Sequence, residues 1–144
     1  MRLPRLLCCL LLLPLLWLGQ AQAKVRPYDD MVASGVLRVA VYDKFPPYSF
    51  QQDGQPRGVD VDLAKRLAEG LGLRAEFLWM VPGESLDDDL RNFIWKGHYL
   101  RPGVVADLML RVPYDRNYSN KRNDVGELAN AQVVMFGPYQ RERW

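Results

Sequence analysis

Apolar residues recur at every second position in two stretches of the chain and form nearly continuous runs in two others, which together predict four β-strands. Every second residue is apolar in residues 36–42 and again in residues 73–79, which is the period of a strand with one buried face. Residues 104–112 are nearly all apolar and predict a third strand, and residues 132–136 predict a short fourth one. We interpret most of the polar stretch before the fourth strand as a loop.

An amphipathic helix is predicted between the first two strands, opening at Gly58 and ending at Gly70 or Gly72. Asp60 is expected to accept hydrogen bonds from the free amides of its first turn. The face of the helix that we expect to be buried repeats every four residues and includes two neighbouring alanines. Its members are Val59, Leu63, Leu67, Leu71, Ala64 and Ala68.

A second helix is predicted to begin at Ser85, which together with Asp88 resembles a capping box, and to end at Gly97. The order strand, helix, strand, helix, strand is typical of parallel strands with helices packed on the sheet. We therefore predict an α/β fold with a central, mostly parallel sheet and flanking helices.

The first 23 residues have the pattern of a signal peptide. A positively charged start is followed by an apolar run at residues 6–18 and by a small-residue cleavage pattern at residues 21–23. The run is shorter than the ~20 apolar residues of a membrane span, although a retained anchor is the alternative. We expect cleavage after Ala23 and export to the periplasm. Residues 24–35 then form a polar lead-in, in which Pro27 disfavours regular structure.

Charge and composition argue against several classes of function. The chain has 19 basic and 17 acidic residues, so it lacks the strong basic excess that is typical of nucleic-acid-binding proteins. Cys8 and Cys9 both lie in the signal peptide, so no disulfide framework is expected. His98 is the only histidine, and no nucleophile elbow or phosphate-binding glycine loop is present. We expect no cofactor, no metal and no enzymatic activity.

The segment LRVAVYDKFPPYSF, a hairpin turn at Asp53-Gly54 and the helix start GVDVDLAK together resemble a known family. They are similar to the beginning of the type 2 periplasmic solute-binding proteins, extracellular family 3. The resemblance implies a ligand cleft at the carboxyl end of the first strand, the edge where open α/β sheets bind ligands. It makes Asp43, Phe45 and Tyr48 candidate ligand-binding residues. A hydrophobic plug under the hairpin is the alternative for the two rings.

Two further candidates come from the family's arginine, which binds the α-carboxylate of amino-acid ligands through a bidentate contact. Arg116 is the nearest match in this chain and Arg111 is the second, because the family's Gly-x-Thr motif is absent and the spacing is shorter. A surface arginine neutralised by Asp115 is the alternative. Residues 135–139 are similar to the family's FSxPY segment, which makes Tyr139 a candidate for the cleft.

The resemblance also implies a domain organisation. Residues 36–139 correspond to the first lobe, and residues 140–144 to the start of the hinge crossover. Members of the family have two lobes and longer chains, so we expect an incomplete protein with half a cleft and weak binding or none.

The leading functional hypothesis is the first lobe of a periplasmic solute-binding protein. Its partner would be an ABC transporter permease that takes up a small polar solute such as an amino acid. Residues 90–99 are also similar to a subgroup that accompanies PQQ-dependent quinoprotein dehydrogenases and their cytochromes. An accessory protein of such a dehydrogenase is therefore the alternative. A dehydratase-type enzyme on the same fold is a third hypothesis, and it would require a cleft carboxylate such as Asp43.

Overall fold

The computed structural model describes residues 25–141, so the predicted signal peptide lies outside the described residues. The elements follow in the order α1 (Tyr28–Ser34), β1 (Val36–Tyr42), β2 (Phe50–Gln52), β3 (Gln55–Arg57), α2 (Val59–Gly70), β4 (Arg74–Met80), α3 (Leu86–Leu90), a π-helical turn (Arg91–Trp95), β5 (Leu108–Met109) and α4 (Arg116–Asn120). None of the helices within residues 25–141 is long and apolar enough to cross a membrane.

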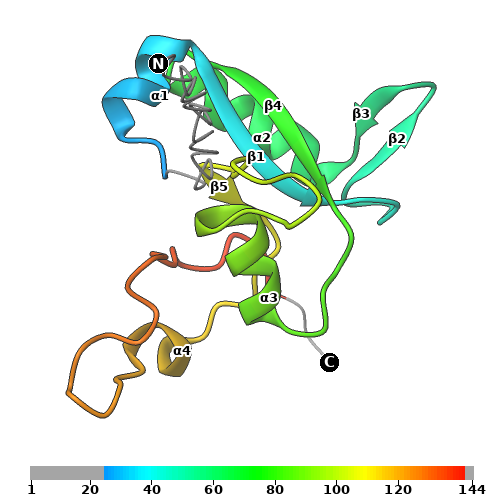
Figure 1. Cartoon of the computed structure of the whole chain (residues 1–144). Coiled ribbons are helices and arrows are strands. Elements are labelled where there is room, and N and C mark those ends of the chain that lie inside the picture. The colour runs from blue at the N-terminus through cyan, green and yellow to red at the C-terminus, as the bar shows by residue number, and fades with distance from the viewer. Residues whose placement is uncertain (1–24, 142–144) are drawn as a thin grey trace, which may run out of the picture.

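The central sheet has three parallel strands in the order β4-β1-β5 (Figure 1). β1 pairs with β4 along its whole length, from Val36 opposite Arg74 to Tyr42 opposite Met80. β2 and β3 form a separate antiparallel hairpin. Its turn contains Asp53 with φ 51° and Gly54 with φ 72°, as the Asp-Gly pair predicts. The predicted α/β fold with a parallel sheet and flanking helices is confirmed.

Helices pack on both faces of this sheet. On one face, Leu37, Val39 and Val41 of β1 pack in a core cluster with helix α2 and with Met31 of α1. On the opposite face, Ala40 and Met80 share a cluster with residues from the π-helical turn and from the segment before β5. The alternating side chains of β1 are therefore buried on both faces, which is typical of a central parallel strand.

The predicted buried face of α2 is wrong in part. The buried apolar residues are Val61, Ala64 and Ala68, whereas Leu67 is 41% exposed and Leu71 is 46% exposed. The small alanines pack in the core cluster beneath α2, and the longer leucines remain partly in solvent.

Three other predictions are wrong in their extent. The lead-in at residues 24–35 contains α1. Pro27 is compatible with this helix because it lies just before the first helical residue, a position at which proline is tolerated. The predicted third strand is reduced to Leu108–Met109, and Arg111, inside the predicted range, adopts a left-handed backbone with φ 60°. Residues 132–136 form turns and irregular structure, with Phe136 71% exposed.

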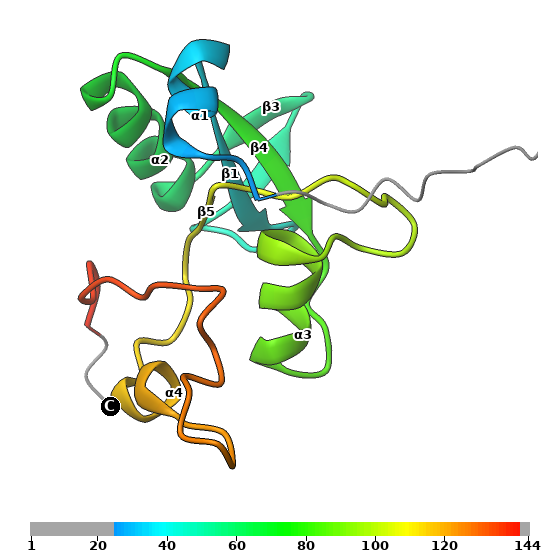
Figure 2. The ribbon, with the colours of Figure 1, turned by 60° about the vertical axis from the view of Figure 1, so that its left-hand side comes forward.

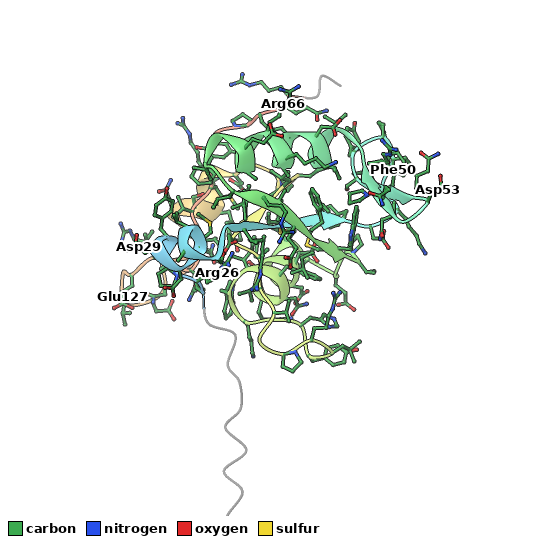
Figure 3. All side chains as sticks on the ribbon, turned by 90° about the horizontal axis from the view of Figure 1, so that it is seen from above. Arg26, Asp29, Phe50, Asp53, Arg66 and Glu127 are labelled. Atoms are coloured by element: carbon green, nitrogen blue, oxygen red, sulfur yellow. The ribbon has the colours of Figure 1, made fainter. Side chains whose placement is uncertain are left out.

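An ion pair holds the amino-terminal segment against the start of the sheet. The Arg26 guanidinium donates two hydrogen bonds to the carboxylate of Asp107, which precedes β5. It also donates to the Ser34 hydroxyl and to the carbonyl oxygen of Val36. Asp107 in turn accepts a bond of 2.8 Å from the Arg38 amide. Figure 3 shows Arg26 beside α1, on the opposite side of the molecule from the hairpin tip at Asp53.

Candidate functional site

The three parallel strands end at one edge of the sheet, and the candidate site lies there. β1 ends at Tyr42, β4 at Met80 and β5 at Met109. The Asp43 amide donates to the Met80 carbonyl oxygen at 2.8 Å, so the chain leaves β1 along this edge. Ligands of open α/β sheets bind beyond this carboxyl edge.

The turn after β1 is closed by its own backbone. Phe45 and Ser49 exchange hydrogen bonds between their amides and carbonyl oxygens, at 2.8 and 2.9 Å. The buried Ser49 hydroxyl donates to the Tyr42 carbonyl oxygen at 2.6 Å. This closed turn holds the rings of Phe45 and Tyr48 with their centroids 5.2 Å apart.

Gly58 allows the start of α2 to lie against this turn. A Cβ atom at position 58 would be 2.2 Å from the Tyr48 carbonyl oxygen, and Gly58 has φ 118°. A side chain is therefore excluded by both contact and conformation. The Asp60 amide donates to the same carbonyl oxygen at 2.9 Å. This bond joins the first turn of α2 at Asp60 to the turn after β1.

Asp60 pairs with Arg111, which follows β5. Arg111 Nε lies 2.7 Å from Asp60 Oδ2 and Arg111 Nη2 lies 2.9 Å from Asp60 Oδ1, a bidentate pair. Asp60 is 1% exposed, and the bond to Asp60 raises the pKa of Arg111. Arg111 Cζ lies 3.5 Å from the centroid of the Tyr48 ring, a cation–π contact.

Two residues from the end of the described chain complete the arrangement. The Arg111 amide donates to the Tyr139 hydroxyl at 2.8 Å, and that hydroxyl donates to Asp60 Oδ1 at 3.2 Å. Arg111 Nη2 also donates to Gln140 Oε1 at 2.8 Å. Burial, with the nearby charge of Asp60, raises the pKa of Tyr139 to about 12. We call Tyr48, Asp60, Arg111, Tyr139 and Gln140 the arginine cluster.

The structure brings together three of the six residues singled out from the sequence: Tyr48, Arg111 and Tyr139. Phe45 adjoins them through its contact with Tyr48. Asp43 lies at the same edge, where its carboxylate accepts a bond from the Lys44 amide. Arg116, the preferred arginine, is instead the first residue of α4 and is exposed. Figures 1 and 2 both show α4 apart from the sheet.

Sequence reasoning missed the role of Asp60. It does not cap α2, since the helix has no side-chain cap, and its carboxylate binds Arg111 instead. A signal was present, because Asp60 lies four residues before Ala64 and eight before Ala68 and therefore shares their buried face. A buried carboxylate requires a partner. Gln140 was also missed, and no local pattern marks it.

A second buried carboxylate supports the same edge without facing the arginine cluster. Asp89 is 4% exposed and accepts bonds from the Tyr42 hydroxyl at 2.8 Å and from the Gly83 amide at 2.6 Å. Burial raises the pKa of Tyr42, and the bond to Asp89 adds to this effect. Since both oxygens of Asp89 are engaged, we interpret it as an anchor for the chain after β4.

No group of three or more histidine, cysteine or acidic side chains placed to hold a metal occurs within residues 25–141. A shallow hollow of about 330 Å³ lies away from the arginine cluster, between Arg38, Glu76 and the loop at residues 103–105. None of the residues that line it belongs to the arginine cluster. We assign the candidate site to the carboxyl edge, because the aromatic rings and the guanidinium converge there.

Comparison with known proteins finds similarity for the first part of this edge. Residues 37–92 match the bacterial extracellular solute-binding proteins, family 3. This range includes Asp43, Phe45, Tyr48 and Asp60, whereas Arg111 and Tyr139 lie outside it. A cyclohexadienyl dehydratase of Pseudomonas aeruginosa is 43% identical over 63 residues, which are 43% of this chain and 24% of that protein. The matched part of the chain thus spans about a quarter of this relative.

Solved structures give partial overlaps. An ancestral cationic amino acid solute binding protein is 35% identical over 46% of this chain and 28% of its own, with a TM-score of 0.38. An ancestral cyclohexadienyl dehydratase is 31% identical over 46% of this chain and 26% of its own, with a TM-score of 0.39.

Proposed function

We infer that this chain, in which residues 37–92 belong to the bacterial extracellular solute-binding proteins of family 3, provides the first lobe of an exported solute-binding protein. Its ligand is a small polar solute such as an amino acid. The lobe forms one wall of a cleft, and closure of a second wall over it buries the ligand. The protein works in the periplasm and delivers the solute to an ABC transporter permease.

The observation that carries this proposal is the arginine cluster at the carboxyl edge. Its guanidinium is oriented by the buried Asp60 and lies against the Tyr48 ring. Phe45, which is 42% exposed, packs on Tyr48. The guanidinium supplies hydrogen-bond donors for ligand oxygens, and the exposed Phe45 supplies an aromatic surface for a flat or apolar part. Arg111 also has φ 60°, and such backbone strain is concentrated at functional sites.

An NMR titration of the ¹⁵N-labelled protein with each of the twenty amino acids tests this proposal. Because the chain spans about a quarter of its relative, we expect a dissociation constant of about 1 mM or weaker, with shifts centred on Tyr48, Asp60 and Arg111. Replacing Tyr48 by Leu should abolish the shifts, and replacing the exposed Tyr28 by Leu should preserve them. Shifts centred on α4 instead would contradict the location of the site. A micromolar dissociation constant would contradict the proposal that this lobe forms only one wall of the cleft.

The protein partner of this lobe can be identified from the genes next to its own. Genes for a permease and an ATPase next to the gene of this protein would support transport. A neighbouring quinoprotein dehydrogenase with a cytochrome c would support the alternative, in which the lobe serves as an accessory protein of that enzyme.

The similarity to a cyclohexadienyl dehydratase favours a second candidate, an enzyme that removes water from a cyclohexadienyl compound. We propose binding without catalysis. Loss of water from such a ring gives an aromatic product, so ultraviolet absorbance follows the reaction directly. We expect no rate above the uncatalysed one. A rate that is abolished by Asp43→Asn, with an unchanged fold, would replace binding by catalysis.

A further inference from the structure

We propose that Tyr139 and Gln140 form an internal latch on Arg111, and that a ligand oxygen must displace Gln140 to bind. The latch rests on the proposed function, since it regulates access to the same site. Its contacts join segments that are far apart in the sequence: Arg111 to Gln140 over 29 residues and Asp60 to Tyr139 over 79.

Within residues 25–141, Arg111 Nη2 donates to Asp60 and to Gln140, and these two acceptors differ in burial. Asp60 Oδ1, at 2.9 Å, belongs to a side chain that is 2% exposed. Gln140 Oε1, at 2.8 Å, belongs to an exposed residue. Asp60 is the fixed inner partner, because an unpaired buried carboxylate is costly. Gln140 is the exchangeable outer partner, since its amide is solvated when released.

The chemistry at Nη2 favours replacement of Gln140 by an anionic ligand. An ionised carboxylate oxygen accepts a stronger hydrogen bond from a guanidinium than a neutral amide oxygen does. The position of Gln140 Oε1 therefore defines a subsite for a carboxylate oxygen. Because the ligand competes with the latch, its apparent affinity is the intrinsic affinity multiplied by the fraction of molecules in which the latch is open.

Tyr139 positions Gln140 next to Arg111. Its hydroxyl accepts from the Arg111 amide and donates to Asp60, so the residue before Gln140 is fixed by two bonds. Tyr139 is 49% exposed, which leaves the segment free to open from its outer side. Opening breaks three hydrogen bonds of the described residues and leaves the Asp60–Arg111 pair intact.

The latch is tested first without any ligand, by following the Arg111 Nε–H signal in ¹⁵N NMR of the full chain. Gln140→Ala removes the outer acceptor, and Gln132→Ala is the matched control, an exposed glutamine eight residues earlier. We expect an altered guanidinium signal and faster exchange of the amides of residues 139–141 in Gln140→Ala only. Identical spectra for the two variants would overturn the latch, whether or not the protein binds a solute.

Sodium acetate then serves as the minimal carboxylate, against sodium chloride at equal ionic strength. We expect acetate to perturb the Arg111 signal at about three- to tenfold lower concentration in Gln140→Ala than in the wild type, and at higher concentration in Gln140→Glu. Equal responses, or no response in Gln140→Ala, would overturn the competition. An acetate response in Gln140→Ala without amino-acid binding in any variant would support the latch and contradict the proposed solute instead.

Discussion

Two arginine–carboxylate pairs lie at opposite edges of the same sheet, and they have nearly the same geometry. Arg26 binds Asp107 at the amino edge, and Arg111 binds Asp60 at the carboxyl edge, each through Nε and Nη2. Their arginine side chains are similarly shielded, at 18% and 16% exposure. Ion-pair geometry alone therefore does not separate a structural pair from a candidate binding site.

The surroundings separate the two pairs. The other partners of Arg26 are Ser34 and Val36, at the end of α1 and the start of β1, so this pair joins elements of the fold. Arg111 instead contacts an aromatic ring on one side and residues 139–140 on the other. Position on the sheet and the type of neighbour therefore distinguish the candidate binding site, whereas burial and distance indicate only that the pair is formed.

The largest expected effect comes from Gly58→Ala, which disrupts the carboxyl-edge pair and leaves the amino-edge pair intact. The new Cβ would lie 2.2 Å from the Tyr48 carbonyl oxygen at φ 118°. Strain and the forced shift together should lower the free energy of unfolding by about 4 kcal/mol, measured by urea denaturation.

The same substitution at Gly70 is the control, because it lies in the same helix with open space around it. Gly70→Ala should be neutral or stabilise by up to ~1 kcal/mol. Equal effects at the two positions would contradict the close approach of α2 to the turn after β1.

The next largest effect should come from Asp60→Asn, compared with Asp107→Asn. Asp60→Asn leaves a shielded guanidinium without its carboxylate and should cost about 3 kcal/mol. Asp107→Asn should cost about 2 kcal/mol, because the side chain of Asp107 is 11% exposed and that of Asp60 is 2% exposed. Hydrogen exchange separates the two variants: Asp60→Asn should loosen residues 139–141, and Asp107→Asn should loosen α1. The reverse pattern would contradict the assigned roles.

Local sequence patterns predicted the part of the site that depends on neighbouring residues. Three local features place Phe45 and Tyr48 at the carboxyl edge: the period-two strand, the Asp-Gly turn and the helix start near Gly58. Each of these features depends only on residues that are close together in the sequence. The buried face of α2 was wrong because hydrophobicity alone favours Leu67 and Leu71. Close packing on a sheet favours alanine instead.

The partner of Arg111 could not be predicted in the same way. Asp60 and Arg111 are 51 residues apart, and their contact depends on how β5 aligns beside β1. The preference for Arg116 came from a spacing in the resembled family that this chain does not keep. The left-handed backbone at Arg111 ends β5 and turns the chain, and no pattern of apolar residues indicates such a conformation.

A smaller effect is expected from Tyr48→Leu, which removes the ring from the carboxyl-edge pair only. Loss of the cation–π contact at 3.5 Å should lower the free energy of unfolding by about 1.5 kcal/mol. Tyr28→Leu, at a residue that is 63% exposed, should change it by less than about 0.5 kcal/mol. Thermal denaturation of both variants checks the difference, and equal shifts in Tm would show that the ring does not support Arg111.

The smallest effect at neutral pH, and the most specific one, is expected from Tyr139→Phe. It removes two hydrogen bonds at the half-exposed Tyr139 hydroxyl and should cost about 0.5–1 kcal/mol at pH 7. The pKa of Tyr139 is raised to about 12 in the folded protein, so the unfolded chain loses this proton first as pH rises. The contribution of the neutral hydroxyl is thus complete below pH ~10 and decreases as pH rises toward ~12.

Tyr42 and Tyr118 also have raised pKa values, so the wild type and the variant both become less stable in this range. The stability difference between wild type and Tyr139→Phe is therefore the quantity to measure, by urea denaturation between pH 9 and 12 against Tyr28→Phe as control. A difference that shrinks above pH ~10 supports a hydroxyl bound between Arg111 and Asp60, and a constant difference would place Tyr139 outside the carboxyl-edge pair.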